Sequence, residues 1–466
     1  MDALKLVLGE TYPTARAITQ RDFRNHDTSL EINIKIQFNE GISTYAGDCY
    51  GFCLKIKNDD LDYYTLQQNR LPLTYKGKPV RISNEMREQI PLIFVDIDRS
   101  AQNQLRPTKW TLYGRILGTL NRKFQGTTGA DEFSSKIEEA REILKKEIIK
   151  DFERNLEDGL SNLTDIPVGL EFSIADPLDH LKTLRPYFIE NELRFDAEQV
   201  GMGLQSALLV SLTRVYKEIV KESGIIAIEE PGLYLHPHAR HHFYNVLKEM
   251  TDSGTQVFYS THDSEFLDLV SPQFIYLVKK ENGTTQVYTF DESLSQIEAA
   301  KLVTKIAPKV TEIFFSKLVI LVEGEIDRIA VSSLLEKNDI DINRFSISVL
   351  PCGSKNEIPF VGTILRKFNV PTITLFDEDP GKPSETRNEE IKITIGKDNV
   401  YIMCPNFEEI FGFKSKLSQI EAIKHFDEIS LSNYPDIFNR LLESVQNFVR
   451  ENSKEGTMEQ ENELPF

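Results

Sequence analysis

The sequence contains few cysteines and no long apolar stretch, and both features narrow the class of protein that it can encode. Four cysteines (Cys49, Cys53, Cys352 and Cys404) in 466 residues are too sparse for the disulfide framework of a small secreted protein. No run of about 18 apolar residues occurs, so no membrane-spanning helix is predicted. The first residues, MDALKLVLGETYPTAR, lack the basic and apolar regions of a secretory signal. We therefore predict a cytoplasmic protein without membrane association.

An excess of basic residues is also missing. The chain has 54 Lys and Arg against 72 Asp and Glu, for a net charge of −18. Proteins that bind nucleic acid by covering its phosphates are usually basic. The charge argues against tight passive binding of DNA, but it does not argue against an enzyme whose carboxylates hold metal ions.

Cys49 and Cys53 have a spacing that could hold a metal ion, but the sequence around them has no His or Cys cluster to complete a site. We interpret them as packing thiols in a reducing compartment.

The first half of the chain shows strand patterns and one highly charged segment. Residues 29–38 (SLEINIKIQF) alternate as a half-buried strand does, and 52–57 and 91–98 are further predicted strands. Residues 132–157 are highly charged, with apolar residues at helical spacing. This segment predicts a helical dimerisation arm within about 130–190, although a surface helix of the same domain would have the same pattern.

From residue 224 onward, apolar strands alternate with helices. Strands are predicted at 224–230, 255–261, 318–324, 346–350, 372–376 and 399–403, with a hairpin at 275–290 and a linking helix at 295–307. This alternation indicates parallel sheets, whose ligands bind at the carboxyl ends of the strands. With a boundary near 308–315, we predict domains at 1–310 and 315–425, C-terminal helices at 426–450 and a disordered acidic tail at 451–466.

The strand at 224–230 ends in two acids, Glu229 and Glu230, directly before a proline and a helix. In nucleotide hydrolysis, the first acid of such a pair holds Mg²⁺ through water and the second polarises the attacking water. The next strand ends in STHD, where His262 could sense a γ-phosphate. Upstream, GMGLQ (201–205) opens an apolar helix, and backbone amides at a helix start favour a phosphate.

In this order, these motifs resemble the ABC-type ATPases of the structural-maintenance and overcoming-lysogenisation-defect (OLD) kind. The resemblance implies a Walker B pair, Glu229 and Glu230, with His262 as the switch histidine. It also implies a divergent signature motif that contacts the nucleotide, formed by Gly201, Gly203 and Gln205. Glu229 stands where most ABC proteins have Asp, and the chain contains no G-x-x-x-x-G-K-[ST] segment.

The start of the chain, MDALKLVLGETYPTARAITQRDF, resembles the segment that follows the phosphate loop in these ATPases. The resemblance implies that the chain begins inside the helix after that loop. ATP is the nucleotide of the family, but we expect this chain to bind it weakly and to have little or no ATPase activity.

A second group of acids follows the later strands. LVILVEG (318–324) ends in Glu323, and Asp327 can face the same pocket from the first turn of the next helix. TITLFDEDP (372–380) presents Asp377 and Asp379 with alternate spacing, so both point the same way. Clustered carboxylates repel one another unless cations intervene, and such ligands select Mg²⁺ or Mn²⁺. Two such ions about 4 Å apart can cleave a phosphodiester.

The pattern of an apolar strand ending in Glu-Gly, followed by Asp-x-Asp, resembles the Toprim domain, and its place after an ABC ATPase resembles the OLD-family nucleases. The resemblance implies an α/β fold, with an ABC-type ATPase domain (mixed sheet with a helical arm) followed by a Toprim Rossmann-like parallel-sheet domain. The implied metal ligands are Glu323, Asp327, Asp377, Asp379 and Glu408, with Glu409 as second choice for the last. Glu323 and Asp377 are also assigned to catalysis, together with Glu230 and His262.

Two other features stay open or are set aside. Family members use a Lys near the scissile phosphate, and Lys414 or Lys416 could serve, but the sequence does not decide. Asp96 and Asp98 also have the Asp-x-Asp spacing, but no Glu-Gly strand accompanies them, so we interpret them as structural.

The sequence therefore predicts a Mg²⁺- or Mn²⁺-dependent endonuclease of DNA with a regulatory ATPase domain, acting as a homodimer or larger assembly. A role in defence against phage, with a second protein, is what the resemblance implies. The alternative is a non-catalytic regulatory or scaffolding subunit, which five clustered acids argue against. A primase would bring a zinc ribbon and a topoisomerase a separate domain with a nucleophilic Tyr; neither fits this sequence.

Overall fold

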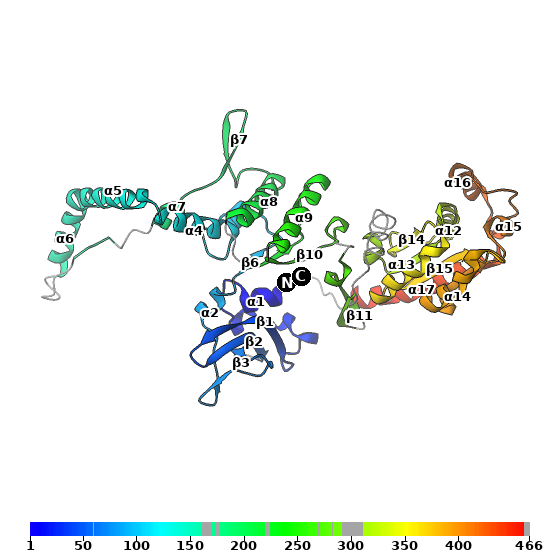
Figure 1. The fold of residues 1–466 in the computed structure, drawn as a ribbon, viewed down its shortest axis with the longest axis horizontal. Coiled ribbons are helices and arrows are strands. Elements are labelled where there is room, and N and C mark those ends of the chain that lie inside the picture. Colours follow the sequence, from blue (N-terminus) through cyan, green and yellow to red (C-terminus); the bar gives the residue numbers. More distant parts are fainter. Residues whose placement is uncertain are drawn as a thin grey trace. The chain divides into compact units, whose positions relative to one another are not determined.

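The computed structural model describes residues 1–58, 60–160, 169–172, 177–219, 224–267, 271–281, 283–290 and 311–460. It divides into two compact units, Met1–Phe266 and Leu267–Phe466, whose elements are labelled in Figure 1. The linking helix predicted at 295–307 lies outside the described residues, as do the last residues of the predicted tail, 461–466.

Unit 1 begins with helix α1 (Asp2–Leu8), which is followed by an antiparallel sheet of three strands. The strands β1 (Ile32–Thr44), β2 (Gly47–Lys57) and β3 (Asp60–Leu66) lie in the order β1-β2-β3. Apolar side chains of β2, such as Phe52 and Leu54, pack with Val7 and Leu8 of α1. The strands predicted at 29–38 and 52–57 are confirmed.

Both cysteines of β2 are buried and free. The thiol of Cys49 donates to the carbonyl of Gly51, and the thiol of Cys53 lies 3.6 Å from the amide oxygen of Asn33. These contacts agree with the interpretation of Cys49 and Cys53 as packing thiols.

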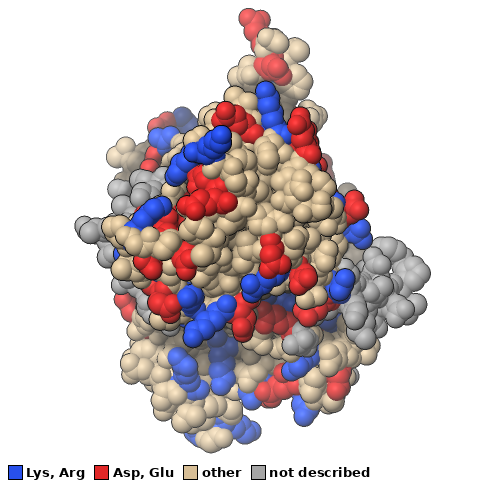
Figure 2. Space-filling model, turned by 90° about the vertical axis from the view of Figure 1, so that its right-hand side faces the viewer, with Lys and Arg blue, Asp and Glu red and all other residues tan. Residues whose placement is uncertain are grey.

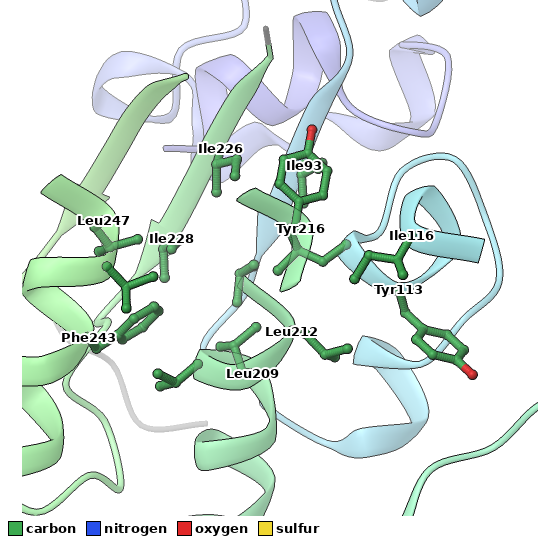
Figure 3. Close-up of a cluster of buried hydrophobic side chains, with 14 of the residues drawn as sticks. Ile93, Tyr113, Ile116, Leu209, Leu212, Tyr216, Ile226, Ile228, Phe243 and Leu247 are labelled. Carbon is green, nitrogen blue, oxygen red and sulfur yellow. The ribbon is translucent and has the colours of Figure 1, made fainter. Parts of the chain in front are cut away.

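The second sheet of unit 1 is parallel and carries the acidic pair. Its strands β6 (Leu92–Val95), β9 (Ile225–Glu229) and β10 (Gln256–Ser260) lie in the order β10-β9-β6. Helices α4 (Leu112–Gln125), α8 (Met202–Ile219) and α9 (Pro237–Asp252) pack against it. Figure 3 shows the core between them, to which the sheet contributes Ile93, Ile226 and Ile228, and the helices Leu209, Leu212, Phe243 and Leu247. The central position of β9 explains its unbroken apolar run.

Shorter elements complete unit 1. They are helices α2 (Asn84–Glu88), α3 (Ala101–Gln104) and α7 (Pro177–Leu181), and the hairpins β4–β5 (Thr74–Tyr75, Lys78–Pro79) and β7–β8 (Tyr187–Glu190, Leu193–Asp196).

The charged segment at 132–157 is helical, as predicted. Helix α5 (Thr128–Leu144) continues through a π-helical segment (Lys145–Ile149) into α6 (Lys150–Leu160). The exposed apolar side chains of this arm are Ile143, Leu144, Ile148 and Phe152. Contact between this arm and a second copy of the chain stays a prediction.

Unit 2 is built on a parallel sheet, as predicted. The hairpin β11 (Tyr276–Glu281) and β12 (Thr284–Thr289) precedes β13 (Leu318–Val322), β14 (Ile347–Pro351), β15 (Thr372–Asp377) and β16 (Val400–Met403). The four later strands lie in the order β14-β13-β15-β16, linked by α12 (Glu325–Lys337), α13 (Ile358–Lys367) and α14 (Arg387–Ile395). The hairpin belongs to unit 2, so the division between units lies before the boundary predicted near 308–315.

Within the described residues, β16 is followed by the α-helices α15 (Phe407–Phe411), α16 (Gln419–Glu428) and α17 (Asp436–Gln460). Helix α17 buries Phe438, Leu441 and Val445 against the sheet domain. Helix α17 extends to Gln460, and the predicted disorder of the acidic tail stays a prediction. No helix among the described residues is long and apolar enough to cross a membrane.

Candidate metal centre and acidic pair

The central strand of unit 2, β13, delivers Glu323 to the carboxyl end of the sheet. All five residues of β13 are buried, and Glu323 follows directly. Its Oε1 accepts a hydrogen bond of 2.9 Å from the backbone N–H of Asp377, at the end of the neighbouring strand β15. Burial raises the pKa of Glu323 to about 7, and the nearby charge of Asp377 adds to the shift.

Asp377 is fixed in the same way from the opposite side. Its Oδ1 accepts a 2.7 Å hydrogen bond from the backbone N–H of Phe407, at the start of α15. Burial raises the pKa of Asp377 to about 6, with further contributions from Asp379 and Glu408. Carboxylate oxygens of Glu323, Asp377 and Asp379 lie within 4.8 Å of one another. The structure therefore brings together three acids that the sequence assigned to one site.

Asp379 differs from the other two because the protein already compensates its charge. Its carboxylate accepts hydrogen bonds from Lys382 Nζ at 2.5 Å and from Ser384 Oγ at 3.0 Å, and Lys355 Nζ lies 3.6 Å away. Burial opposes ionisation of Asp379, but these hydrogen bonds and charges outweigh it and lower its pKa.

Asp327 and Glu408 stand beside this cluster. Asp327 is buried in the first turn of α12, where its Oδ2 accepts a 2.8 Å hydrogen bond from the N–H of Gly324. Burial raises the pKa of Asp327 to about 8, with Asp377, Glu323 and Glu408 adding to the shift. Glu408 lies in α15, and its charge contributes to the raised pKa values of Asp327 and Asp377. Its neighbour Glu409 accepts a hydrogen bond from the side chain of Asn406.

The cations at this cluster are residues that the sequence analysis missed. It considered Lys414 and Lys416, whereas the structure places Lys355 and Lys382 against Asp379. Lys355 is only 2% exposed. One signal existed in the sequence, because Cys-Gly-Ser-Lys (352–355) directly follows β14, and polar residues at the carboxyl end of a parallel strand often bind ligands.

The donor set fits a hard divalent cation. Glu323 and Asp377 each accept a hydrogen bond from a backbone N–H at one carboxylate oxygen, and burial raises the pKa of both groups, which a bound cation would oppose. Oxygen ligands of this type hold Mg²⁺, Mn²⁺ or Ca²⁺ rather than softer metals.

In unit 1, the acidic pair lies at the turn after β9. Burial raises the pKa of Glu229, and the charges of Asp96 and Asp2 add to the shift. Glu230 has a φ of 47°, in the left-handed region. The guanidinium of Arg99, which is fully buried, donates to the backbone carbonyls of Glu229, Glu230 and Pro231 and so holds this turn. Arg99 was not among the residues predicted from the sequence; it lies four residues after the end of β6, where no motif marks it.

His262 lies beside Glu230. Its backbone N–H donates to Glu230 Oε2 at 3.3 Å, and its Nε2 lies 3.8 Å from Glu230 Oε1. The imidazole is otherwise 90% exposed. The parallel pairing of β9 with β10 explains this proximity, because both residues follow the ends of paired strands.

The glycine–glutamine turn lies at the start of α8. Gly201 precedes α8 and Gly203 lies in its first turn, but the side chain of Gln205 faces inward. Its Oε1 accepts a 2.6 Å hydrogen bond from the N–H of Ala101, and its Nε2 donates to the carbonyl of Val200. The amide of Gln205 is therefore engaged in internal contacts, as a buried polar group must be, and its contact with a nucleotide stays a prediction.

The pair set aside as structural, Asp96 and Asp98, makes one long-range contact and two local ones. Asp96 forms an ion pair with Lys5 at 3.1 Å, and Asp98 accepts hydrogen bonds from the N–H of Ser100 and the side chain of Asn103. Asp96 nevertheless lies close enough to raise the pKa of Glu229.

Family models match both units. A model described as an AAA ATPase domain matches residues 57–267, and one described as an overcoming lysogenization defect protein-like TOPRIM domain matches residues 314–379. The second match includes Glu323, Asp327, Asp377 and Asp379, whereas Glu408 lies beyond it. The two matches confirm the predicted order of an ATPase domain and a TOPRIM domain.

Similar proteins span the whole chain or part of it. The chain is 26% identical to the OLD nuclease of Thermus scotoductus, over 96% of the chain and 92% of that relative. It is also 26% identical to the Old nuclease of Escherichia phage P2, over 55% of the chain and 45% of the relative. Identity to the endonuclease GajA of Bacillus cereus is 21%, over 57% of the chain and 46% of the relative.

Proposed function

We propose that this chain, which joins an AAA ATPase domain to a TOPRIM domain of the overcoming-lysogenisation-defect family, is a Mg²⁺- or Mn²⁺-dependent endonuclease of DNA. The observation that carries the proposal is the cluster of Glu323, Asp377 and Asp379 at the ends of two adjacent parallel strands. The similarity to two nucleases and one endonuclease supports the reaction class.

The chain's own residues would position the cations and balance charge. Glu323 and Asp377 would hold a cation between the two strand ends, with Asp379, Asp327 and Glu408 as further oxygen donors. When bound, such ions polarise water and stabilise the leaving oxygen of a phosphodiester. Lys382, whose side chain is 61% exposed beside Asp379, presents a positive charge that can approach a DNA phosphate.

We expect the chain to contact DNA mainly at the metal centre and not over a broad basic surface. Figure 2 shows one face of the molecule, on which basic and acidic side chains are interspersed, in keeping with the net charge of −18. Metal ions and a few side chains would therefore supply most of the contacts to phosphate, and binding should require the cation.

In unit 1 we propose a regulatory role for Glu229, Glu230 and His262, which lie at the strand ends where a nucleotide phosphate would bind. Gly201 and Gly203 remain proposed contacts to the nucleotide through their backbone. Defence against phage, and a second protein of such a system, are proposed because the family name refers to a defect in lysogeny.

The test is cleavage of supercoiled plasmid by the purified chain. With Mg²⁺ or Mn²⁺ present, nicked or linear DNA should appear, and an excess of chelator should abolish it. If the folded chain binds Mn²⁺ but cuts neither single-stranded nor double-stranded DNA, the nuclease proposal fails and the scaffolding alternative gains support.

A further inference from the structure

The turn after β15 carries both Asp377 and Asp379, and two buried side chains hold its backbone. Lys355 Nζ donates to the carbonyl of Asp377 at 2.6 Å and to that of Glu378 at 3.0 Å. Asn388 Nδ2 also donates to the carbonyl of Glu378, at 3.0 Å. Lys355 comes from the loop after β14 and Asn388 from α14, so the turn is held from two separate elements.

The backbone of this turn decides where its two carboxylates point. Asp379 has a φ of 56°, a left-handed conformation that a non-glycine residue adopts only when its surroundings hold it there. The N–H of Glu378 donates to the carbonyl of Met403, and the N–H of Asp379 to that of Pro405. With these bonds and the contacts of Lys355, both the N–H and the C=O groups of the turn are engaged.

The burial of Lys355 needs a reason beyond charge. A lysine that is 2% exposed has lost its hydration, which is unfavourable unless hydrogen bonds and a counter-charge replace it. Lys382 gives Asp379 a positive partner from a side chain that is 61% exposed, without that cost. What Lys355 adds, and Lys382 does not, is a pair of hydrogen bonds to the carbonyls of the turn.

We infer that Lys355 is a positioning residue for the metal centre, with Asn388 as its weaker partner. Lys355 fixes the Asp377–Asp379 backbone so that both carboxylates face one cation, and Asn388 supports the same turn at one carbonyl. This inference rests on the proposed metal-dependent function, and it assigns to Lys355 no contact with DNA.

The chain offers a matched control for this role. Lys382 carries the same charge and contacts the same carboxylate as Lys355, but it lies at the surface. Its ammonium competes with a cation for Asp379, so removing it should not weaken metal binding. Asn388 provides an independent test, because its Oδ1 is buried with no hydrogen-bond partner in the structure. Replacement by Leu, of similar size, therefore removes the bond to Glu378 with little other loss.

The experiment is a calorimetric titration of the full chain with Mn²⁺, for the parent and for Lys355→Met, Asn388→Leu and Lys382→Met. We expect Lys355→Met to weaken Mn²⁺ binding by about 10-fold or more, the size found for residues that orient metal ligands. Asn388→Leu should weaken it less, and Lys382→Met should leave it equal or tighter. In cleavage assays, the Mn²⁺ concentration for half-maximal rate should rise most for Lys355→Met and less for Asn388→Leu, while the rates of these two variants recover at saturating Mn²⁺.

Three outcomes would overturn the inference. The first is Mn²⁺ binding by Lys355→Met within about 2-fold of the parent, far below the effect of such residues. The second is equal weakening in Lys382→Met, because charge alone would then explain both variants. The third outcome matters if Lys355→Met does not fold. In that case, a folded Asn388→Leu variant that binds Mn²⁺ as tightly as the parent would refute the role of the hydrogen-bonded turn after β15. Absence of Mn²⁺ binding by the parent would instead refute the proposed function.

Discussion

The two units place acids at the same topological position but surround them differently. In unit 1, Arg99 contacts the backbone carbonyls of Glu229 and Glu230, and one longer contact of 3.3 Å joins the N–H of His262 to the carboxylate of Glu230. In unit 2, backbone N–H groups contact the carboxylates of Glu323 and Asp377 directly. The comparison shows that a strand end locates an acid, whereas the groups that face its oxygens decide what it can bind. The unit 2 acids are arranged for a cation, and the unit 1 pair is arranged as a rigid turn.

The largest expected effect is on nuclease activity, which should depend on the acids of unit 2 and not on the acidic pair of unit 1. Asp377→Ala removes a carboxylate at the centre of the unit 2 cluster and should lower plasmid cleavage about 100-fold or more, by more than 2.7 kcal/mol in the barrier. Asp377→Asn should do the same while keeping an oxygen for the N–H of Phe407. Glu230→Gln in unit 1 should change cleavage by less than about 3-fold, under 1 kcal/mol on the same scale.

Cleavage rates at saturating Mg²⁺, with melting temperatures for each variant, measure this contrast. Glu336→Gln, an exposed acid of α12, is the control for loss of a charge. If Asp377→Ala cuts as well as the parent, the assignment of the metal site is wrong. An equal loss in Glu230→Gln would mean that the two sites act as one.

The second prediction concerns pH. Burial raises the pKa of Asp377 to about 6, of Glu323 to about 7 and of Asp327 to about 8. These carboxyls hold protons more tightly in the folded chain than in the unfolded chain. Their contribution to stability is therefore present below the unfolded pKa of about 4 and is lost as pH rises through 6 to 8. Without metal, the chain should melt at a lower temperature at pH 8 than at pH 6.

A divalent cation reverses this trend because it binds the ionised carboxylates. For each proton that Mn²⁺ displaces, its apparent affinity should rise about 10-fold per pH unit between pH 6 and 8. Titration calorimetry in two buffers of different ionisation enthalpy gives both the affinity and the number of protons released. In Glu323→Gln the dependence should flatten, and an affinity that does not change from pH 6 to 8 in the parent would contradict the burial of the site.

The acids could be found from sequence because the signal is local. A run of apolar residues that ends in Glu323 or Asp377 marks a buried strand and its carboxyl end at once, and parallel pairing brings such ends together. The partners of these acids could not be found in the same way. Lys355 reaches Asp377 across β13, which separates β14 from β15 in the sheet, and no spacing in the sequence records that contact.

The internal contacts of two other buried polar side chains could not be predicted for the same reason. Gln205 fits a nucleotide-binding turn by its position, but its amide bonds Ala101, 104 residues away. Arg99 likewise holds a turn 130 residues away. A motif gives the type of side chain and its place on an element, whereas the direction of a buried polar group depends on which distant backbone group needs a partner.

The third prediction concerns the oligomeric state, which should depend on unit 1 and not on the metal site of unit 2. The resemblance to ABC proteins implies a nucleotide site shared by two copies, and the arm exposes Ile148 and Phe152. We expect a dimer in light scattering at micromolar concentration. Phe152→Asp places a charge where an apolar contact is predicted and should raise the dimer dissociation constant about 10-fold or more, from the loss of one buried aromatic side chain.

The Mn²⁺ affinity of the same variant should not change, because every residue of the unit 2 cluster comes from one chain. Glu157→Gln on the same helix is the control. If the parent is monomeric under these conditions, the predicted dimer is wrong. If Phe152→Asp loses Mn²⁺ binding, the unit 2 site depends on assembly.

The smallest expected effect is that of ATP. A phosphate loop binds ATP mainly through consecutive backbone amides and a lysine at the β- and γ-phosphates, and these 466 residues contain no G-x-x-x-x-G-K-[ST] segment. Glu229, Glu230 and the neighbouring Asp96 place negative charge at the turn, which repels a triphosphate unless Mg²⁺ is held there. We therefore expect calorimetry to show no micromolar binding of ATP with Mg²⁺, and plasmid cleavage by this chain to change less than about 2-fold with ATP, under 0.5 kcal/mol in the barrier. Glu229→Gln, which removes one repelling charge, should bind ATP no worse than the parent. Micromolar affinity would overturn this expectation and would show that other amides of unit 1 bind the phosphates, which would make its rigid turn a working nucleotide site.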